Sequence, residues 1–323
     1  MDLRRLIRSL SNALAGREFL QDRFEPLVAG MSTLWVLRSV PDHIKLYYRY
    51  CSLGLHRELS HQKTKREFVL CFAKHVDFLP SHAQAIVIQH EHTLLDIDHP
   101  QDGAWDSNLV DGSGKPTHLV RLLGPTSGFE KAHGIIDYSS INITHVSNSN
   151  RGKFYGEKAQ YIAPLLGNPQ NCNRKAGLPR VTTMFGSPDL GRRKDFINQL
   201  HQVGIFPKNI KNFENFEMAF SNSEVLVNVR QFEHLQTPEE LRLLPALLQQ
   251  VLIFSEDAPL HELVRYRDFL VLGGFSELPA RLGEGLEYFH DYWDGIFGSR
   301  SHFDEMVWEL KQSNLSNFSA LVN

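Results

Sequence analysis

Cysteine is scarce in this sequence, and long apolar runs are absent from it. The three cysteines, Cys51, Cys71 and Cys172, are widely spaced and odd in number, so they indicate neither a disulfide framework nor a zinc ribbon and favour a reducing compartment. No apolar run approaches the roughly 20 residues that a bilayer span requires. Residues 1–16 have a charged start but no continuous apolar stretch and no small-residue cleavage site, so they are not typical of a secretory signal. We therefore expect a cytoplasmic chain, either soluble or peripheral to a membrane.

A strong charge of one sign is also lacking. The formal net charge of -3 gives no global attraction to nucleic acid, so we expect no nucleic-acid partner. Residues 1–14 have an amphipathic helical pattern, which allows either a helix docked on its own domain or a weak peripheral contact with a membrane. The apolar face of this helix would consist of Leu3, Leu6, Ile7, Leu10 and Leu14.

Length and the order of patterns favour two α/β domains. A chain of 323 residues exceeds the usual size of one core, so two domains are expected. Strand and helix patterns alternate in both halves, which predicts two Rossmann-like layers facing each other across a cleft. Residues 166–179 have the most linker-like composition, rich in Asn, Gly and Pro. We therefore expect a first domain at 1–166, with leading helices, and a second at 167–290.

The individual elements follow from apolar periodicity and from turn residues. The expected helices lie at 1–14, 17–27, 42–59, 192–203, 238–248, 279–289 and 292–311, with a short helical link at 129–133. The expected strands lie at 68–73, 85–89, 118–123, 134–138, 161–165, 180–185, 206–212, 225–229, 251–254 and 268–272. Residues 96–115 are rich in Asp, Gly, Ser and Pro and predict a long loop.

The stretch 224–257 has the clearest local pattern, a strand, a helix and a second strand that a parallel βαβ unit would join. Thr237 predicts the N-cap of the helix, Pro238 its first residue, and Glu240 the carboxylate of a capping box. Ligands gather beyond the carboxyl ends of strands in open α/β sheets, so polar residues there mark a candidate site. These residues are Asn228, His234, Glu239, Arg242, Ser255 and Glu256. Two of them, Glu239 and Glu256, would suit a ribose diol, although Glu239 would equally favour the helix dipole.

A second candidate is the loop at 186–196, GSPDLGRRKDF, between a predicted strand and a predicted helix. The backbone amides at Gly186 and Ser187 and the helix dipole would point at one place and could bind an anion. Arg192 and Arg193 could add charge against a diphosphate. The alternative is that both arginines are simply solvated.

The segment 89–99, QHEHTLLDIDH, ends an apolar strand and supports three chemistries. His90 and His92 would share one face of a strand and could bind a metal. Asp96 and Asp98 could be the D-x-D of a metal-dependent sugar transferase. No further ligand pattern completes a metal site, and a general base at the edge of the sheet is favoured over it, with an ordinary polar loop as the alternative. The candidate bases are His90, Glu91, His92 and Asp96.

Several segments, taken in order, resemble the landmarks of GT-B glycosyltransferases, in particular the exostosin-like group and bacterial nucleotide-sugar transferases. Each motif is loose, so the common order carries the resemblance, which extends over about residues 68–297. The segments are AIVIQHE at 85–91, IIDYSSINI at 135–143, YIAPL at 161–165, MFGSPDLGRRKDF at 184–196 and PEELRLLPALLQQVLIFSED at 238–257.

The resemblance implies a glycosyltransferase that moves a hexose or pentose from a nucleoside-diphosphate sugar, such as a UDP-sugar, to a hydroxyl of a glycan or glycoconjugate. The second domain would hold the donor, the first would present the acceptor, and a last helix within 291–323 would return to the first domain. Such enzymes carry no permanent cofactor and generally need no metal. Pro245 stands where retaining members commonly place a Glu, which favours inversion.

These expectations combine into one mechanism. Glu91 would remove the acceptor proton, with His92 and Asp96 as the next candidates, and the arginines at 192, 193 and 242 would offset charge on the leaving diphosphate. Two alternatives remain open at this point. One is a GT-B-like protein that binds a nucleotide or glycan without turnover, and the other is a metal-dependent hydrolase that uses His90 and His92.

Overall fold

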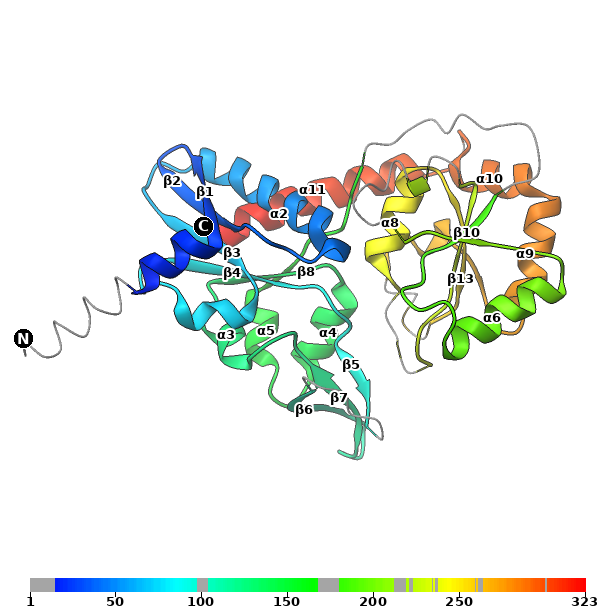
Figure 1. The fold of residues 1–323 in the computed structure, drawn as a ribbon, viewed down its shortest axis with the longest axis horizontal. Coiled ribbons are helices and arrows are strands. Elements are labelled where there is room, and N and C mark those ends of the chain that lie inside the picture. The colour runs from blue at the N-terminus through cyan, green and yellow to red at the C-terminus, as the bar shows by residue number, and fades with distance from the viewer. Residues whose placement is uncertain are drawn as a thin grey trace, which may run out of the picture. The chain divides into compact units, whose positions relative to one another are not determined.

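The structure is a computed structural model, and the chain divides into two compact units (Figure 1). The structure describes residues 15–97, 104–167, 180–211, 219–220, 223–233, 235, 238–258, 260, 264–299 and 301–323. Unit 1 comprises Met1–Ile162 and Ser313–Asn323, and unit 2 comprises Ala163–Gln312. Within the described ranges, no helix is both long enough and apolar enough to cross a bilayer.

Unit 1 is built on a six-stranded sheet with the order β1-β2-β3-β4-β8-β9. The pair β1–β2 is antiparallel, and every other neighbouring pair is parallel. The residues between the ends of β3, β4 and β8 are apolar and buried, as expected for strands that helices cover on both faces. The strands are β1 (Phe24–Ala29), β2 (Ser32–Leu37), β3 (Glu67–Cys71), β4 (Gln84–Gln89), β8 (Gly134–Asp137) and β9 (Ala159–Tyr161).

In Figure 1, α2 and the end of α11 (Phe303–Val322) lie on one side of this sheet, and α3 and α5 lie on the other. Polar contacts attach the end of α11 to unit 1, since Asn314 Nδ2 donates to Tyr50 Oη at 2.9 Å and Asn317 Nδ2 donates to Tyr161 O at 2.7 Å. The helices of unit 1 are α2 (Asp42–Ser60), η1 (Ala73–Phe78), α3 (Thr126–Lys131), α4 (Ser140–Asn148) and α5 (Lys153–Lys158).

The start of unit 1 differs from the sequence prediction. Residues 17–27 were predicted to be one helix, but the helix ends at Arg23 and a strand begins at Phe24. Strands β1 and β2 pair across a two-residue turn, whose first residue, Gly30, has φ +60. Glycine at this position suits a tight hairpin turn. The predicted helix at 42–59 is confirmed as α2.

The predicted long loop at 96–115 is wrong, because much of it forms a small antiparallel sheet with the order β5-β7-β6. Its strands are β5 (Leu94–Asp96), β6 (Ala104–Val110) and β7 (Pro116–Arg121). The polar composition belongs to the turn between β6 and β7, where Asp111 Oδ1 accepts hydrogen bonds from Ser113 N at 2.8 Å and Lys115 N at 3.0 Å. Asp and Gly therefore mark a hairpin turn here rather than an unstructured loop.

Unit 2 contains a five-stranded parallel sheet with the order β11-β10-β12-β13-β14. Every residue of β12 and of β13 is buried, which agrees with strands covered on both faces. The strands are β10 (Val181–Thr183), β11 (Lys208–Asn209), β12 (Val225–Asn228), β13 (Leu252–Glu256) and β14 (Val271–Gly273), and η3 (Arg267–Phe269) precedes the last of them. The expectation of parallel α/β sheets is confirmed in both units.

The βαβ unit predicted at 224–257 is confirmed as β12, α8 (Glu240–Leu248) and β13. The predicted helix start is wrong, because the helix begins at Glu240 and Glu239 occupies the N-cap position without a side-chain cap. Thr237, the predicted N-cap, lies outside the described residues. The helix continues through Pro245 to Leu248.

The remaining helices of unit 2 are α6 (Gly191–Gln202), α9 (Leu278–Glu287), α10 (Phe289–Phe297) and α11 (Phe303–Val322). In Figure 1, α8 lies on one side of the unit 2 sheet and α9 on the other. The single helix predicted at 292–311 is wrong, because two helices share this range. The chain leaves the helical conformation at Gly298, where ψ is 170, and a new helix begins at Phe303.

Candidate functional site

In unit 1, a polar loop follows the carboxyl end of β4, and hydrogen bonds from three elements hold its backbone. Gln89 Nε2 donates to Glu91 O at 3.1 Å, and Asn142 Nδ2, from α4, donates to the same oxygen at 3.0 Å. Thr93 Oγ1 donates to Asn142 Oδ1 at 3.0 Å, and Arg121 N, from β7, donates to Thr93 O at 2.8 Å. The loop therefore has one defined backbone position at the edge where ligands gather in such sheets.

Asp137, the last residue of β8, lies beneath this loop and is fully buried. Its Oδ1 accepts hydrogen bonds from Asn142 Nδ2 at 3.1 Å and Ser139 N at 3.0 Å, and its Oδ2 accepts one from Tyr155 Oη at 2.7 Å. Burial raises the pKa of Asp137 to about 7, although the three hydrogen bonds act in the opposite direction. Through Asn142, Asp137 positions the backbone of Glu91.

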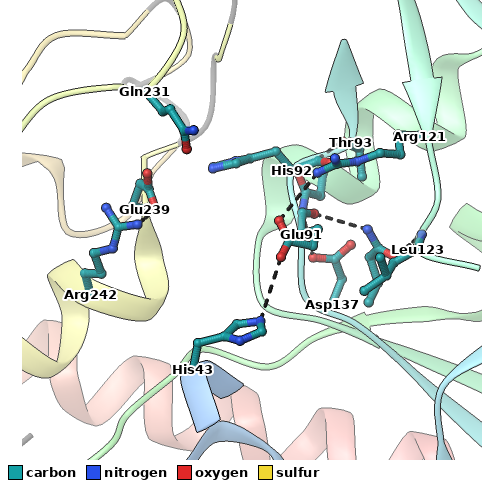
Figure 2. A network of polar contacts seen from close by, with 12 residues as sticks. His43, Glu91, His92, Thr93, Arg121, Leu123, Asp137, Gln231, Glu239 and Arg242 are labelled. Atoms are coloured by element: carbon teal, nitrogen blue, oxygen red, sulfur yellow. Dashed lines mark hydrogen bonds and ion pairs between the residues drawn. The ribbon is translucent and has the colours of Figure 1, made fainter. Parts of the chain in front are cut away.

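The carboxylate of Glu91 projects from this loop and is 37% exposed. Figure 2 shows it between two cationic or titratable partners: Arg121 Nη2 lies 3.4 Å from Oε2, and His43 Nε2 lies 3.9 Å from Oε1. Arg121 Nε also donates to His92 O at 3.3 Å. The Glu91 side chain is thus accessible, oriented by a guanidinium, and keeps free lone pairs with which it could accept a proton.

His90 and His92 do not form the predicted H-x-H pair. Strand β4 ends at Gln89, so the alternation of a strand does not extend to these residues. His90 is buried against the rings of Phe72 and His43, with centroid distances of 5.3 and 5.6 Å, and burial lowers its pKa to about 4. His92 is half-buried, and its side chain points away from His43 in Figure 2.

The structure describes only part of the predicted D-x-D motif, Asp96 and Asp98. Asp96 is the last residue of β5, where it pairs with His118 of β7. Its side chain and the whole of Asp98 lie outside the described residues. Among the residues that the structure describes, the one group with metal-ligand spacing consists of His43, His90 and Glu91, and it includes neither aspartate.

In unit 2, four arginines and two glutamates meet beyond the carboxyl ends of β12 and β13. Glu256, the last residue of β13, accepts from Arg192 Nη2 at 2.7 Å and from Arg230 Nη2 at 2.8 Å. Glu239 accepts from Arg193 Nη2 at 2.9 Å and pairs with Arg242 Nη2 at 2.8 Å. Two backbone contacts tie both halves to the end of β12: Arg192 Nη1 donates to Arg230 O at 3.1 Å, and Arg193 Nε donates to Val229 O at 3.5 Å. We call these six charged residues the arginine cluster.

The arginine cluster is largely buried and carries excess positive charge. Each of its side chains is at most 24% exposed. Burial alone would raise the pKa of Glu256, but hydrogen bonds from Arg192 and Arg230 outweigh it and hold the pKa below its usual value. Burial lowers the pKa of Arg193 to about 10 against the opposing effect of Glu239, so the guanidinium stays charged at neutral pH. Four cations against two anions leave two positive charges.

Aromatic rings support two of these guanidinium groups. Arg192 Cζ lies 4.2 Å from the centroid of the Phe275 ring, and Arg193 Cζ lies 4.8 Å from that of Phe185. Such stacking fixes the plane of a guanidinium while its edge stays available for hydrogen bonds. The alternative that both arginines are simply solvated is wrong, since each is bonded to a carboxylate.

The other predicted residues of unit 2 fall in different places. Asn228 and Ser255 are buried within the sheet, where Asn228 Nδ2 donates to Ser255 Oγ at 3.1 Å. Gly186 and Ser187 lie in an exposed loop before α6, and no side-chain cap occupies the start of that helix. His234 lies outside the described residues.

Three residues that contact the Glu91 carboxylate or belong to the arginine cluster were not predicted: His43, Arg121 and Arg230. Arg230 directly follows β12, so the rule that selected its neighbours beyond strand ends would also have found it. His43, in the first turn of α2, and Arg121, at the end of β7, come from segments far away in the sequence. Neither lies in a local motif, and only the fold brings them to Glu91.

Comparisons with known proteins give distant similarities. No family model matches the chain. A protein of Acanthamoeba polyphaga mimivirus named "Uncharacterized protein R358" is 25% identical over 179 residues, which cover 53% of this chain. The match spans 58% of the length of that relative.

Two solved structures are similar at low TM-scores. A chain of the glycosylation-associated protein (Gap123) complex of Streptococcus agalactiae has a TM-score of 0.45 and 9% identity, over 86% of this chain and 57% of its own. An α1,3-fucosyltransferase crystallised with GDP has a TM-score of 0.40 and 10% identity, over 96% of this chain and 97% of its own.

Proposed function

We propose that the chain is a glycosyltransferase of the GT-B type that transfers a sugar from a nucleoside-diphosphate donor to a hydroxyl of a glycan or glycoconjugate. The arginine cluster of unit 2 is the observation that carries this proposal. A partly buried site with two excess positive charges suits a diphosphate. The planar guanidinium of arginine donates two parallel hydrogen bonds to phosphate oxygens, so arginine suits this ligand better than lysine does. The uncapped start of α6 adds free backbone amides on the same side of the sheet.

The glutamates of the cluster have a different role here from the predicted one. Because Glu239 and Glu256 each accept hydrogen bonds from two arginines, they hold the guanidinium groups in place rather than a ribose diol. Arg242 Nη1 is buried and has no hydrogen-bond partner among the described residues. A preorganised set of donors stabilises charge that grows on a leaving group without reorganising at the moment of reaction.

Glu91 of unit 1 is the base in this proposal. Its carboxylate takes the proton of the acceptor hydroxyl, and the acceptor oxygen bonds to the anomeric carbon of the donor sugar. The bond from that carbon to the diphosphate oxygen breaks, and its electron pair leaves with the nucleoside diphosphate. A single displacement of this kind inverts the anomeric centre. Glu91 becomes neutral when it takes the proton, and the departing diphosphate gains the negative charge. The arginine cluster offsets that charge, and the reaction proceeds without a metal. A UDP-sugar is the donor that we expect.

A thermal-shift panel of nucleoside diphosphates tests donor binding. A cognate diphosphate at a hundred times its dissociation constant should stabilise the protein by about 2.7 kcal/mol. We expect Arg192→Gln to abolish this shift, because it removes a charge from the cluster. Arg180→Gln is a matched control: Arg180 forms a 2.6 Å ion pair with Glu224 at the opposite edge of the same sheet. If no diphosphate shifts the melting temperature, or if both variants respond alike, the proposed donor site is wrong.

A further inference from the structure

Two histidines and a glutamate converge at the edge of the unit 1 sheet. His43 comes from the first turn of α2, and His90 and Glu91 follow β4. One ring nitrogen of each histidine and one oxygen of Glu91 all lie within 4.8 Å of one another. Figure 2 shows the His43 ring facing the carboxylate of Glu91.

This set of ligands fits one class of cation. Two imidazoles and one carboxylate are the ligands of many open zinc sites, whereas magnesium and calcium prefer oxygen ligands throughout. In a tetrahedral zinc site, ligand atoms about 2.0 Å from the ion lie about 3.3 Å apart. The three groups therefore need to close by up to about 1.5 Å, and the side chains of His43 and Glu91, 51% and 37% exposed, have room to rotate.

Two further observations support a ligand at this position. His90 is 7% exposed, and its Nδ1 is buried with no hydrogen-bond partner among the described residues. Buried polar atoms are nearly always paired, so an unpaired one needs an explanation. On the opposite side, Arg121 Nη2 contacts Oε2 of Glu91 and leaves Oε1 directed at His43. A second contact of this kind orients a ligand carboxylate.

We propose that His43, His90 and Glu91 form a binding site for a divalent ion of the zinc class, and that occupation of this site inhibits transfer. An ion bound to Oε1 takes up the lone pair with which Glu91 would accept the acceptor proton. Binding depends only on the three ligands, whereas inhibition also rests on the proposed function. The remaining coordination position is open to water.

Cobalt(II) is the probe for binding, because its visible absorption reports tetrahedral coordination by nitrogen and oxygen. The full chain, freed of any affinity tag and treated with a chelator, should bind one Co²⁺, and Zn²⁺ should displace it while Mg²⁺ does not. We expect His43→Ala and His90→Gln each to weaken binding at least tenfold. His82→Ala should have no effect, because among the described residues His82 is paired with one carboxylate, Glu67, at 2.8 Å, and is not part of the ligand group. An absent cobalt spectrum would overturn the proposal, as would equal affinity in the wild type and the His43→Ala variant.

Two measurements separate failure of this site from failure of the proposed function. His43 is exposed, so His43→Ala should melt at the wild-type temperature, and a change in cobalt affinity then reports the site rather than folding. In a transfer assay, Zn²⁺ should inhibit the wild type and lose at least tenfold in potency against His43→Ala. Diphosphate binding in unit 2 is measured without metal, so its absence refutes the proposed function and leaves the cobalt result intact. Cobalt binding without inhibition would refute only the coupling to Glu91.

Discussion

At Glu91 the backbone is fixed, but the carboxylate retains freedom. Gln89 and Asn142 hold the carbonyl, whereas the side chain has longer contacts of 3.4 and 3.9 Å to Arg121 and His43. We expect Glu91→Gln to lower the rate of transfer by about 100-fold or more, because a positioned general base contributes at least that factor. The thermal shift with a diphosphate should not change.

A matched variant controls for loss of charge at this sheet. Glu67→Gln removes a carboxylate that also contacts a histidine, but at the start of β3, and it should transfer at the wild-type rate. Steady-state assays of both variants with one donor and one acceptor distinguish them. Wild-type turnover in Glu91→Gln would exclude Glu91 as the base.

Asp137 makes the stability of unit 1 depend on pH. Its pKa in the folded chain is about 7, well above the value of about 3.9 expected in an unfolded chain. The folded state therefore holds a proton more tightly, and this contribution to stability is fully present below about pH 4. It is lost progressively as the pH rises through 7, by at most about 4 kcal/mol.

The variant Asp137→Asn has no proton to lose, so it should gain stability relative to the wild type as the pH rises from about 5 to about 8. Urea unfolding of both proteins at several pH values gives this difference. Asp268→Asn is the control, because Asp268 is 88% exposed and its replacement should leave the pH profile as it is. A difference between wild type and Asp137→Asn that is constant with pH would contradict the raised pKa.

At the scale of elements, α9 packs on β13 through a glycine. A Cβ atom added at Gly285 would lie 2.0 Å from the Phe254 ring, whereas one added at Gly283 meets nothing within 4 Å. We expect Gly285→Ala to destabilise unit 2 by about 1–3 kcal/mol through overpacking. Gly283→Ala, in the same helix, should stabilise it by up to about 1 kcal/mol, since alanine favours helices over glycine. Urea unfolding of the two variants measures both effects, and equal stabilities would show that α9 does not pack as described.

Elements that are buried on both faces could be predicted from the sequence, and those at edges could not. The strands β12 and β13 are apolar throughout, so their pattern depends little on context. In contrast, β1 is an edge strand with exposed Glu25 and Pro26, and its composition is compatible with a helix until Gly30 is recognised as a hairpin turn. Proline is tolerated at such an edge because no neighbouring strand needs its N–H.

The same distinction applies to the polar groups of each unit. Arg192, Glu239 and Glu256 follow strands or begin helices, so a rule about strand ends finds them. Which of them pair could not be predicted, because the partner of each comes from a different loop. His43 reaches Glu91 from α2 only because the sheet places the start of that helix beside the end of β4. Contacts of this kind depend on the fold and leave no local pattern.

At the scale of the whole molecule, each unit has its own sheet and core, and the last residues of the chain belong to unit 1. Ser313–Asn323 group with that unit, and Phe318 is 2% exposed, close to Gly54 of α2. We expect Phe318→Ala to cost about 3–5 kcal/mol of unit 1 stability, as for other buried phenylalanines. Trp308, in the same helix α11, is 61% exposed, so Trp308→Ala should change stability by less than about 0.5 kcal/mol.

Hydrogen exchange shows whether the loss of stability caused by Phe318→Ala stays within unit 1. Cooperative units open separately when each has its own core, so Phe318→Ala should reduce protection of the amides in β3, β4 and β8. The amides of β12 and β13 should keep wild-type protection, and the thermal shift with a diphosphate should persist, because the arginine cluster lies in unit 2. If β12 and β13 lose protection to the same extent, the two sheets unfold together and the chain is a single cooperative unit despite its two cores.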